Sequence, residues 1–223
     1  LGNGSSSRSA ACIRAQFDEE DNVRGMMYAE WFFENFYDQL GMNPSQSQEW
    51  IFQQNGYLFL YENPSFGQDS IKLTQAWDKA QLKAKMQQGL GLDVQILDGQ
   101  EVHQRWPHIK QERIIGATFC NSDGFLNHDL VYQLAFARAK ELGAQVLTNT
   151  EVLGAEHLGG HIVSLNTSQG DLSAKWIVNA TNAWAPRLSR VLGGMELPIE
   201  VRKRYLYWVK PGSHFVPDTQ WRD

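Results

Sequence analysis

The first residues that could do chemistry form a run of glycines and serines near the start of the chain. Gly2 and Gly4 precede the serines at 5–7, and Arg8 follows directly. Glycine adopts backbone conformations that other residues avoid, and serine hydroxyls with unhindered amides can hold a phosphate at the start of a helix. The run therefore predicts a phosphate-binding loop. A flexible Gly/Ser linker is the alternative that the same composition allows.

The hydrophobic pattern predicts the helices and strands that must position this loop. Apolar residues recur at helical spacing after the acidic residues 18–21, and they alternate around Asn55-Gly56, a dipeptide typical of hairpin turns. The expected helices are 18–40, 71–88, a short helix that ends at 106–107, 129–142 and 185–192. The expected strands are a hairpin within 50–61, then 94–97, 114–121, 145–149, three hairpin strands that start at 152 and turn near 159–160 and 169–170, a buried parallel strand at 175–180, and 197–209. The lysines of helix 71–88 are expected on its solvated face; they are Lys72, Lys79, Lys83 and Lys85.

Composition and charge narrow the function classes. With 20 Lys and Arg against 25 Asp and Glu, the chain carries a net charge of −5, which argues against a general nucleic-acid binder. No apolar run reaches the roughly 18 residues that a membrane-spanning helix needs. Six histidines show no metal-ligand spacing, so no metal is expected. Cys12 and Cys120 provide no disulfide framework and suit a reducing compartment such as the cytoplasm.

Three stretches of the sequence together resemble one protein family. They are the opening run from Leu1 to Phe17, then Asp123-Gly124-Phe125-Leu126 with the following residues to 152, and finally Ile177-Val178-Asn179-Ala180-Thr181-Asn182-Ala183-Trp184-Ala185-Pro186. In this order they resemble the superfamily of FAD-dependent D-amino acid oxidases and sarcosine oxidases. The chain departs from the family at His128, where proline is usual, and at Asn182, which replaces a glycine. Asparagine is the residue other than glycine that best tolerates left-handed backbone angles.

The resemblance implies an α/β fold in which a Rossmann-like FAD-binding domain and a mixed-sheet substrate domain are interleaved. Residues 1–40 and 125–195 would belong to the FAD domain, and residues 45–122 and 196–223 to the substrate domain. The family places a glycine-rich βαβ unit before the segment that opens this chain, and a last flavin-contacting segment after its end. We therefore expect the chain to be the central part of such a protein, with the N-terminal βαβ unit and the C-terminal part missing.

The resemblance also implies a set of cofactor contacts. The residues expected to contact FAD are Ser5, Ser6, Ser7, Arg8, Ala11, Cys12, Ile13, Val152, Ala180, Thr181, Asn182 and Trp184. Val152 matches the position whose backbone binds adenine in the family. For Arg8 the alternative is exposure to solvent, and for Cys12 it is a role as a small buried residue.

Arg14 is the candidate catalytic residue, because it lies where sarcosine-type oxidases place the arginine that binds the substrate carboxylate. A guanidinium group is suited to that role, since it binds a carboxylate through two parallel hydrogen bonds. The alternative is a surface ion pair of Arg14 with Asp18 or Glu19, which would contribute little.

The resemblance implies FAD-dependent oxidation of a small amine or amino acid, such as sarcosine, glycine or proline, by hydride transfer to the flavin. An electron-acceptor protein and a second copy of the chain are the further partners considered. The alternative function is a flavin-binding assembly or interaction protein without turnover. It is retained because Arg202-Lys203-Arg204-Tyr205 resembles a stretch of mitochondrial FAD-dependent-oxidoreductase-domain proteins linked to respiratory-complex assembly.

Overall fold

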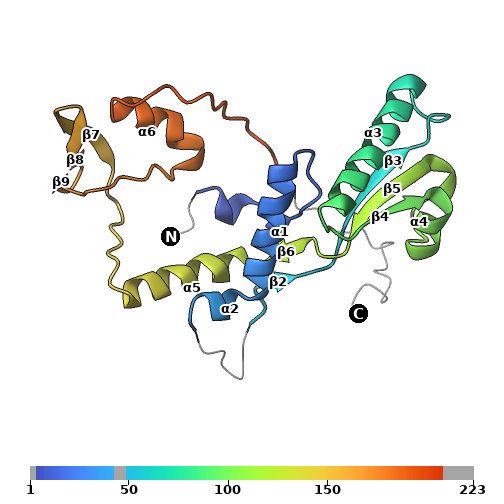
Figure 1. Ribbon diagram of the computed structural model, residues 1–223, viewed down its shortest axis with the longest axis horizontal. Coiled ribbons are helices and arrows are strands. Elements are labelled where there is room, and N and C mark those ends of the chain that lie inside the picture. Colours follow the sequence, from blue (N-terminus) through green and yellow to red (C-terminus); the bar gives the residue numbers. More distant parts are fainter. Residues whose placement is uncertain (1–3, 43–48, 208–223) are drawn as a thin grey trace. The chain divides into compact units, whose positions relative to one another are not determined.

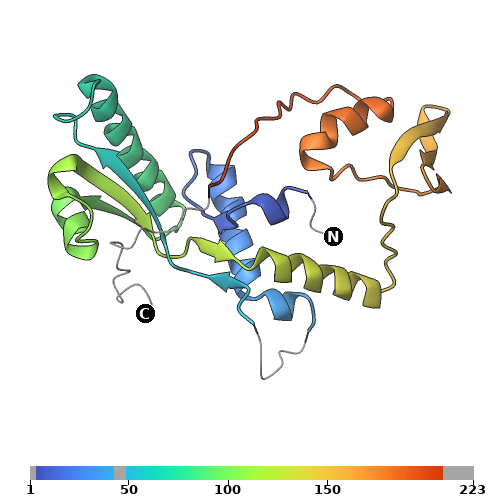
Figure 2. The same cartoon turned by 180° about the vertical axis from the view of Figure 1, so that it is seen from behind.

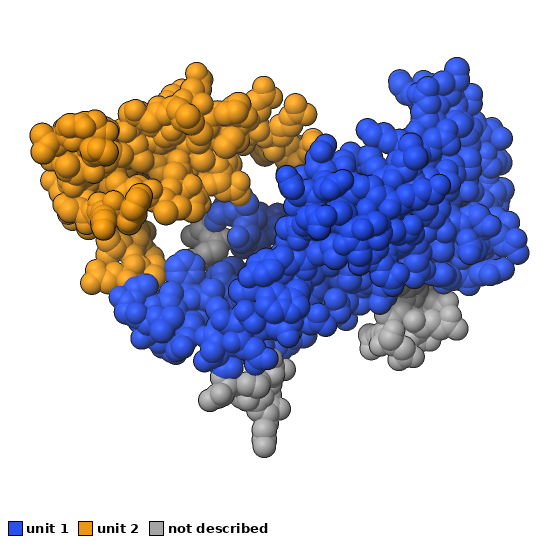
Figure 3. Space-filling view, in the orientation of Figure 1, with its two compact units in different colours: residues 1–144 blue, residues 145–223 orange. Residues whose placement is uncertain are grey.

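The computed structural model describes residues 4–42 and 49–207, so Gly2 and the end of the strand expected at 197–209 lie outside the described residues. The chain divides into two compact units, residues 1–144 and 145–223 (Figure 3). Each unit contains both helices and strands, which confirms the expected α/β class. The interleaved domain boundaries inferred from the family resemblance stay a prediction.

The first unit carries most of the regular structure (Figure 1). Its helices are α1 (Glu20–Glu34), α2 (Phe36–Gln39), α3 (Ser70–Gly89), α4 (Gly99–Arg105) and α5 (His128–Glu141), with the 3-10 helices η1 (Ser6–Arg8) and η2 (Gln111–Arg113). Its strands are β1 (Cys12–Ile13), β2 (Phe52–Gln53), β3 (Tyr57–Glu62), β4 (Val94–Asp98), β5 (Ile114–Cys120) and β6 (Gly124–Leu126). The helices expected at 71–88 and 129–142 are confirmed to within one residue at each end.

The longest strands of this unit form an antiparallel sheet with the strand order β3-β5-β4. Helix α3 lies along one face of the sheet and α4 packs on the other (Figures 1 and 2). Successive residues of β5 face these two helices in turn, because side chains alternate along a strand. Gly116 faces Trp77 of α3, whereas Ala117 joins Val102 of α4 in a buried cluster.

A second, smaller sheet holds the segment before Arg14. Its strand order is β1-β6-β2, with Cys12 opposite Phe125 and Phe52 opposite Leu126. A side chain at Gly124 would collide with the backbone of Gln53, so the pairing of β2 with β6 requires glycine there. The Asp123-Gly124 dipeptide thus brings β2 and β6 together beside β1.

The buried core links α1 and α3 to the start of the chain. The buried residues of this cluster are Ala15, Val23, Ala84, Leu92, Val94 and Cys120. Val23 comes from α1 and Ala84 from α3. Because Ala15 is fully buried in this cluster, the backbone next to Arg14 is held by the core.

The second unit contains the antiparallel sheet β7 (Val152–Leu158), β8 (His161–Thr167) and β9 (Gly170–Leu172), followed by η3 (Asn182–Trp184) and α6 (Ala185–Val191). The three predicted hairpin strands are confirmed, with positive φ at Gly159, Gly160 and Gly170 in the turns. His157 of β7 contacts the end of α6, where its Nε2 lies 3.0 Å from the carbonyl oxygen of Leu192.

The predicted hairpin at Asn55-Gly56 is wrong. Gly56 does have positive φ, but the strands on its two sides pair with different partners: β2 pairs with β6, and β3 pairs with β5. The amide of Gly56 donates to the carbonyl oxygen of Asp123 at 2.9 Å, so the bend passes the chain from one sheet to the other.

Three other predicted strands are not formed at 145–149, 175–180 and 197–207. Alternating or continuous apolar residues form a strand only where a neighbouring strand accepts their backbone hydrogen bonds. Within the second unit no described strand pairs with 175–180, and Trp176 and Val178 are 81% and 84% exposed. In the described residues no helix combines the length and apolar character required to cross a membrane.

Candidate functional site

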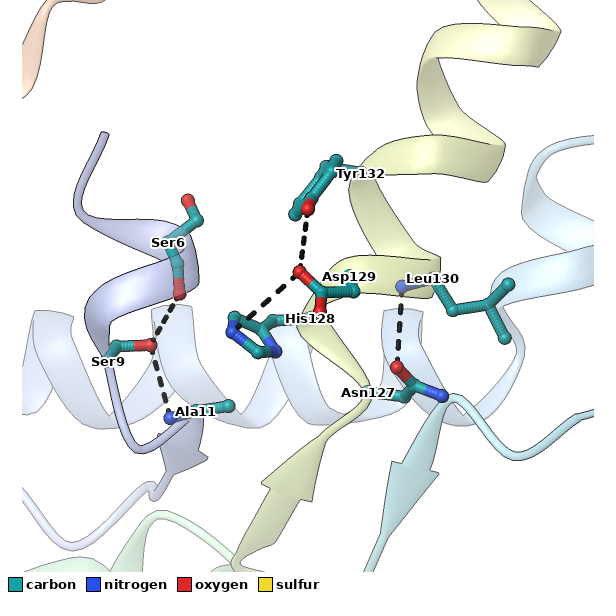
Figure 4. Close-up of polar contacts among 8 residues, drawn as sticks. All are labelled: Ser6, Ser9, Ala11, Asn127, His128, Asp129, Leu130 and Tyr132. Carbon is teal, nitrogen blue, oxygen red and sulfur yellow. Dashed lines mark hydrogen bonds and ion pairs between the residues drawn. The ribbon is translucent and has the colours of Figure 1, made fainter. Parts of the chain in front are cut away.

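The serine-rich loop has a defined local structure. Ser6–Arg8 form the 3-10 helix η1, and Ser5 precedes it. The Ser9 hydroxyl donates to the carbonyl oxygen of Ser6 at 3.0 Å and accepts from the amide of Ala11 at 3.1 Å (Figure 4). Ala11 adopts a left-handed φ of 55°, and residues 4–10 are exposed. The loop is therefore ordered by its own hydrogen bonds, and its backbone is accessible to a ligand.

The beginning of α5 packs against this loop. The Asn127 side chain accepts from the amide of Leu130 at 3.3 Å and so caps the helix (Figure 4). His128 begins the helix where the family usually has proline, and its Nε2 lies 4.0 Å from Asp129 Oδ1. The Tyr132 hydroxyl donates to the same Asp129 oxygen at 2.6 Å, which raises the pKa of Tyr132. The start of the helix at His128 is thus fixed by the Asn127 cap.

Strand β1 places Cys12 and Ile13 in the small sheet between the loop and Arg14. Cys12 is exposed, and its thiol donates to the carbonyl oxygen of Ala10 at 3.6 Å. The alternative of Cys12 as a small buried residue is therefore wrong in this structure.

Arg14 makes no recorded ion pair among the described residues. Its Nη1 donates to the backbone carbonyl oxygen of Gln16 at 2.6 Å. The guanidinium lies 4.5 Å from the ring centre of Phe17, 5.0 Å from that of Phe59 and 6.0 Å from that of Tyr57. The expected alternative pairing with Asp18 or Glu19 is wrong: neither forms an ion pair with Arg14 among the described residues, and Asp18 pairs with Lys83 of α3.

Arg14 lines a small cavity of about 170 Å³ between the segment after β1, α3 and the β3-β5-β4 sheet. Its other lining residues are Gln16, Asp18, Phe59, Tyr61, Ala80, Lys83, Gln87 and Thr118. The lining thus combines two cationic side chains, Arg14 and Lys83, and the carboxylate of Asp18 with two aromatic rings. Asp18 neutralises Lys83. The guanidinium of Arg14 is therefore the positive charge of this cavity that forms no ion pair among the described residues. The cavity is suited to a small carboxylate.

Lys83 and Gln87 belong to this cavity although the lysines of the helix were expected on a solvated face. Lys72 is indeed exposed, whereas the Lys83 side chain is 28% exposed. The spacing of the buried residues Ala80, Ala84 and Gln87 marks the inner face of α3 and could have shown that Lys83 borders it.

A buried carboxylate supports the segment that carries Arg14. Asp123 is fully buried; its Oδ1 accepts from the amide of Ala15 at 2.7 Å, and its Oδ2 accepts from Gln16 Nε2 at 2.9 Å. The same Gln16 nitrogen donates to the carbonyl oxygen of Tyr57 at 2.9 Å. Gln87 donates to the carbonyl oxygen of Phe17 at 2.7 Å. The backbone on the C-terminal side of Arg14 is thereby held in place.

The second unit contains a separate cavity of about 330 Å³. It is lined by Thr150, Glu151, Val152, Thr181, Trp184, Arg187, Leu188 and Val191. The structure therefore brings three of the predicted FAD contacts together: Val152, Thr181 and Trp184. The size and the largely apolar lining fit a flat heterocycle such as adenine.

The turn before α6 shapes one wall of this cavity. Asn182 has a φ of 50°, so the left-handed conformation expected where the family has glycine is confirmed. The Asn179 side chain accepts from both the amide and the hydroxyl of Thr181, at 3.3 and 2.7 Å. Ala180 and Asn182 do not line the cavity but belong to the turn that orients Thr181 and Trp184.

The predicted cofactor residues thus fall into two groups, Ser5–Ile13 in the first unit and Val152–Trp184 in the second. Within residues 4–42 and 49–207 no three His, Cys, Asp or Glu side chains converge as metal ligands would.

Known proteins resemble this chain in sequence and fold. The family of FAD dependent oxidoreductases (DAO) matches residues 1–222. The N-methyl-L-tryptophan oxidase of Escherichia coli O17:K52:H18 (strain UMN026 / ExPEC) is 30% identical over 126 residues, which are 56% of this chain and 32% of that protein. The monomeric sarcosine oxidase of Arthrobacter sp. (strain TE1826) is 29% identical over 109 residues, 49% of this chain and 28% of that protein. The crystal structure of L-proline dehydrogenase from P. horikoshii matches with a TM-score of 0.70 and 28% identity, covering 86% of this chain and 47% of that chain.

The chain spans about half the length of this solved structure, and the matches cover about a third of the curated relatives. The family match nevertheless extends over nearly all of the chain, and it confirms the resemblance of the three sequence stretches. The cofactor of the family is FAD. This chain therefore belongs to the family of FAD-dependent oxidoreductases.

Proposed function

We propose that the protein oxidises a small amino acid or N-substituted amino acid with FAD. The observation that carries this proposal is the cavity in which the guanidinium of Arg14 is surrounded by aromatic rings and has no recorded acidic partner. The named substrates of the similar proteins, N-methyl-L-tryptophan, sarcosine and L-proline, support an amino acid as the substrate class.

Arg14 would bind the substrate carboxylate. One of its nitrogens donates to Gln16, which leaves further N–H groups of the fork for a carboxylate. The rings of Phe17 and Phe59 contact the guanidinium by cation–π interactions that help to hold it in place. A charged hydrogen bond in such a site contributes about 1.5–3 kcal/mol to binding. This arrangement would orient the amine end of the substrate away from Arg14.

FAD, when bound, supplies the redox chemistry by taking up a hydride from the carbon next to the amine nitrogen, and water then hydrolyses the resulting imine. The residues proposed to hold the cofactor are those of the exposed loop at 5–13 and those of the cavity around Val152, Thr181 and Trp184. The loop contributes accessible amides and hydroxyls, and the cavity contributes an apolar surface for adenine.

The test is an absorbance titration of the purified, FAD-loaded protein under anaerobic conditions. Sarcosine, L-proline, glycine and N-methyl-L-tryptophan are added in turn, and bleaching of the flavin band by at least one of them is the expected result. Arg14→Ala should raise the concentration needed for half-maximal bleaching at least tenfold. Arg113→Ala is the matched control, since Arg113 also contacts a ring, that of Phe66, but lies outside the cavity.

A bound flavin that none of these amines bleaches would contradict the proposal and favour the alternative of a flavin-binding assembly or interaction protein. This alternative is supported by the exposure of apolar side chains next to Arg202-Lys203-Arg204. Val201, Tyr205 and Tyr207 are each at least 65% exposed. A partner protein that accepts electrons, self-association and a cytoplasmic location stay predictions.

A further inference from the structure

Two carboxylic acids are buried together behind Arg14. Glu30 of α1 is 4% exposed and Asp123, between β5 and β6, is fully buried. The two side chains lie close enough for each to affect the pKa of the other, and Glu30 is also close to the Ser122 hydroxyl. Buried acidic residues are rare unless they are paired with a cation or share a proton. No cation is recorded as a partner of either side chain among the described residues.

The hydrogen bonds around this acid pair favour an additional proton. Both oxygens of Asp123 already accept, from Ala15 and from Gln16. The Gln16 Nε2 group donates to Asp123 and Tyr57, and buried Glu30 Oε1 and Gln16 Oε1 have no hydrogen-bond partner. An ionised Glu30 would add only acceptors next to Asp123, whose two oxygens already act as acceptors. A neutral Glu30 carboxyl, in contrast, supplies the donor that Asp123 can accept.

The titration properties of the pair agree with this geometry. Burial, reinforced by the interaction with Asp123, raises the pKa of Glu30 from 4.5 to about 7, although the Ser122 hydrogen bond opposes the shift. Burial also raises the pKa of Asp123, against the hydrogen bonds from Gln16 and Ala15. The third titratable group there is Cys120 of β5, and burial raises its thiol pKa to about 11, so it stays neutral.

We propose that Glu30 is a positioning residue for substrate binding: its neutral carboxyl donates to Asp123, and Asp123 holds the Ala15 amide and the Gln16 side chain that set the place of Arg14. This inference rests on the proposed role of Arg14 in carboxylate binding. Glu30 itself does not line the cavity and touches no substrate.

Loss of the Glu30 proton is expected to weaken substrate binding. It leaves two negative charges buried in contact, and their repulsion costs free energy unless the side chains move apart. Asp123 can move only by stretching its bonds to Ala15 and Gln16, and the carbonyl of Gln16 is the acceptor for Arg14. The charged groups on the cavity side, Asp18 and Lys83, are paired with each other. Carboxylate affinity should therefore fall as the pH rises through neutrality.

The test compares wild type with Glu30→Gln in the FAD-loaded protein. The probe is acetate, whose binding is followed by its perturbation of the flavin spectrum between pH 5.5 and 8.5. In wild type we expect the acetate dissociation constant to rise about tenfold across this range. Glu30→Gln keeps a neutral hydrogen-bond donor of the same shape, so its acetate affinity should stay nearly constant. Glu34→Gln, an exposed position one turn further along α1, is the matched control and should behave as wild type.

A second measurement separates this inference from the proposed function. Urea unfolding of the same proteins across the same pH range reports the buried proton without any ligand. If Arg14→Ala binds acetate as well as wild type does, the proposed role of Arg14 fails, and the unfolding data still show whether Glu30 is neutral. If Glu30→Gln alters the pH dependence of unfolding but not that of acetate binding, the positioning role is overturned while carboxylate binding by Arg14 stands.

A second variant covers the case in which Glu30→Gln does not fold. Asp123→Asn removes the neighbouring charge, so the fall in acetate affinity should shift to a different pH or disappear. An acetate affinity that follows the wild-type pH profile in either variant would overturn the proposal.

Discussion

The side-chain amide of Gln16 donates to Asp123 Oδ2 at 2.9 Å, and this bond ties the backbone beside Arg14 to the turn between β5 and β6. The residues are 107 positions apart in sequence. The bond thus connects two of the stretches by which the chain resembles its family, and both lie in the same unit.

Replacing Asp123 by alanine should destabilise the first unit. The amide of Ala15 and the Gln16 side chain would lose their buried acceptor, and each unsatisfied buried donor costs about 1–3 kcal/mol. We expect the free energy of unfolding to fall by about 2–6 kcal/mol in a urea titration, since two donors are affected. Asp78→Ala, at an exposed position of α3, should change it by less than about 0.5 kcal/mol. Equal effects of the two substitutions would contradict the supporting role of Asp123.

The stability of the protein should decrease as the pH rises from about 4.5 to about 7, the range between the usual pKa of Glu30 and its value in the folded protein. In this range folded Glu30 keeps a proton that the unfolded chain has lost, so the folded state binds more protons and is favoured at the lower pH. The slope is at most about 1.4 kcal/mol per pH unit for one group. Urea unfolding at several pH values measures it, and Glu30→Gln should flatten it. A stability that rises over this range in wild type and variant alike would show that Glu30 is ionised.

Arg14→Lys should impair substrates with a carboxylate although the charge is kept. Lysine lacks the planar fork that binds two oxygens and stacks on Phe17 and Phe59. The expected rise in KM for an amino acid is about 10-fold to 100-fold, which corresponds to the loss of about 1.5–3 kcal/mol. The matching amine without its carboxylate is the control substrate, and its KM should change little. A parallel loss for both substrates would argue that Arg14 acts elsewhere than on the carboxylate.

Trp184→Ala should weaken FAD binding through the cavity of the second unit. The Trp184 ring is 67% exposed and lines that cavity, where it can stack on a flat base. Stacking of a base on an aromatic ring contributes about 1–3 kcal/mol, so the FAD dissociation constant should rise about tenfold in a fluorescence titration. Trp176→Ala is the control, because Trp176 is 81% exposed and lies outside the cavity lining. Equal loss of affinity in the two variants would place adenine elsewhere.

Two glycines of the first unit should respond to alanine in opposite directions. A Cβ at Gly116 would lie 2.5 Å from the Trp77 ring and 2.7 Å from the carbonyl oxygen of Leu97, and such overpacking costs about 1–3 kcal/mol. A Cβ at Gly25, inside α1, would meet nothing within 4 Å, so Gly25→Ala should stabilise the helix by about 0.5–1 kcal/mol. Thermal unfolding measures both. If Gly116→Ala were tolerated without loss, the packing of α3 on β5 described above would be incorrect.

The sequence was sufficient for the elements whose hydrogen bonds are local. The helices α3 and α5 and the hairpin strands β7 to β9 form where periodicity and turn residues predict them, because their backbone partners lie within a few residues or across one turn. The family assignment also came from the sequence, since its three stretches combine glycine, serine and asparagine positions with a defined order along the chain.

Elements that depend on distant partners were decided by the tertiary structure. Asn55-Gly56 has the local chemistry of a hairpin turn, yet β5 and β6, about 60 residues later, pair with the strands on its two sides. Residues 175–180 have the composition of a buried strand but no paired neighbour among the described strands.

The candidate site also combines a residue that the sequence predicted with contacts that only the tertiary structure showed. The sequence by itself predicted Arg14 as the candidate catalytic residue, because an arginine at a family position carries that prediction. Only the tertiary structure showed that Asp18 pairs with Lys83 rather than with Arg14. It also showed that Glu30 and Asp123 are buried close to each other. Charge pairing and burial depend on which groups meet across α1, α3 and the two sheets, and spacing along one chain does not contain that information.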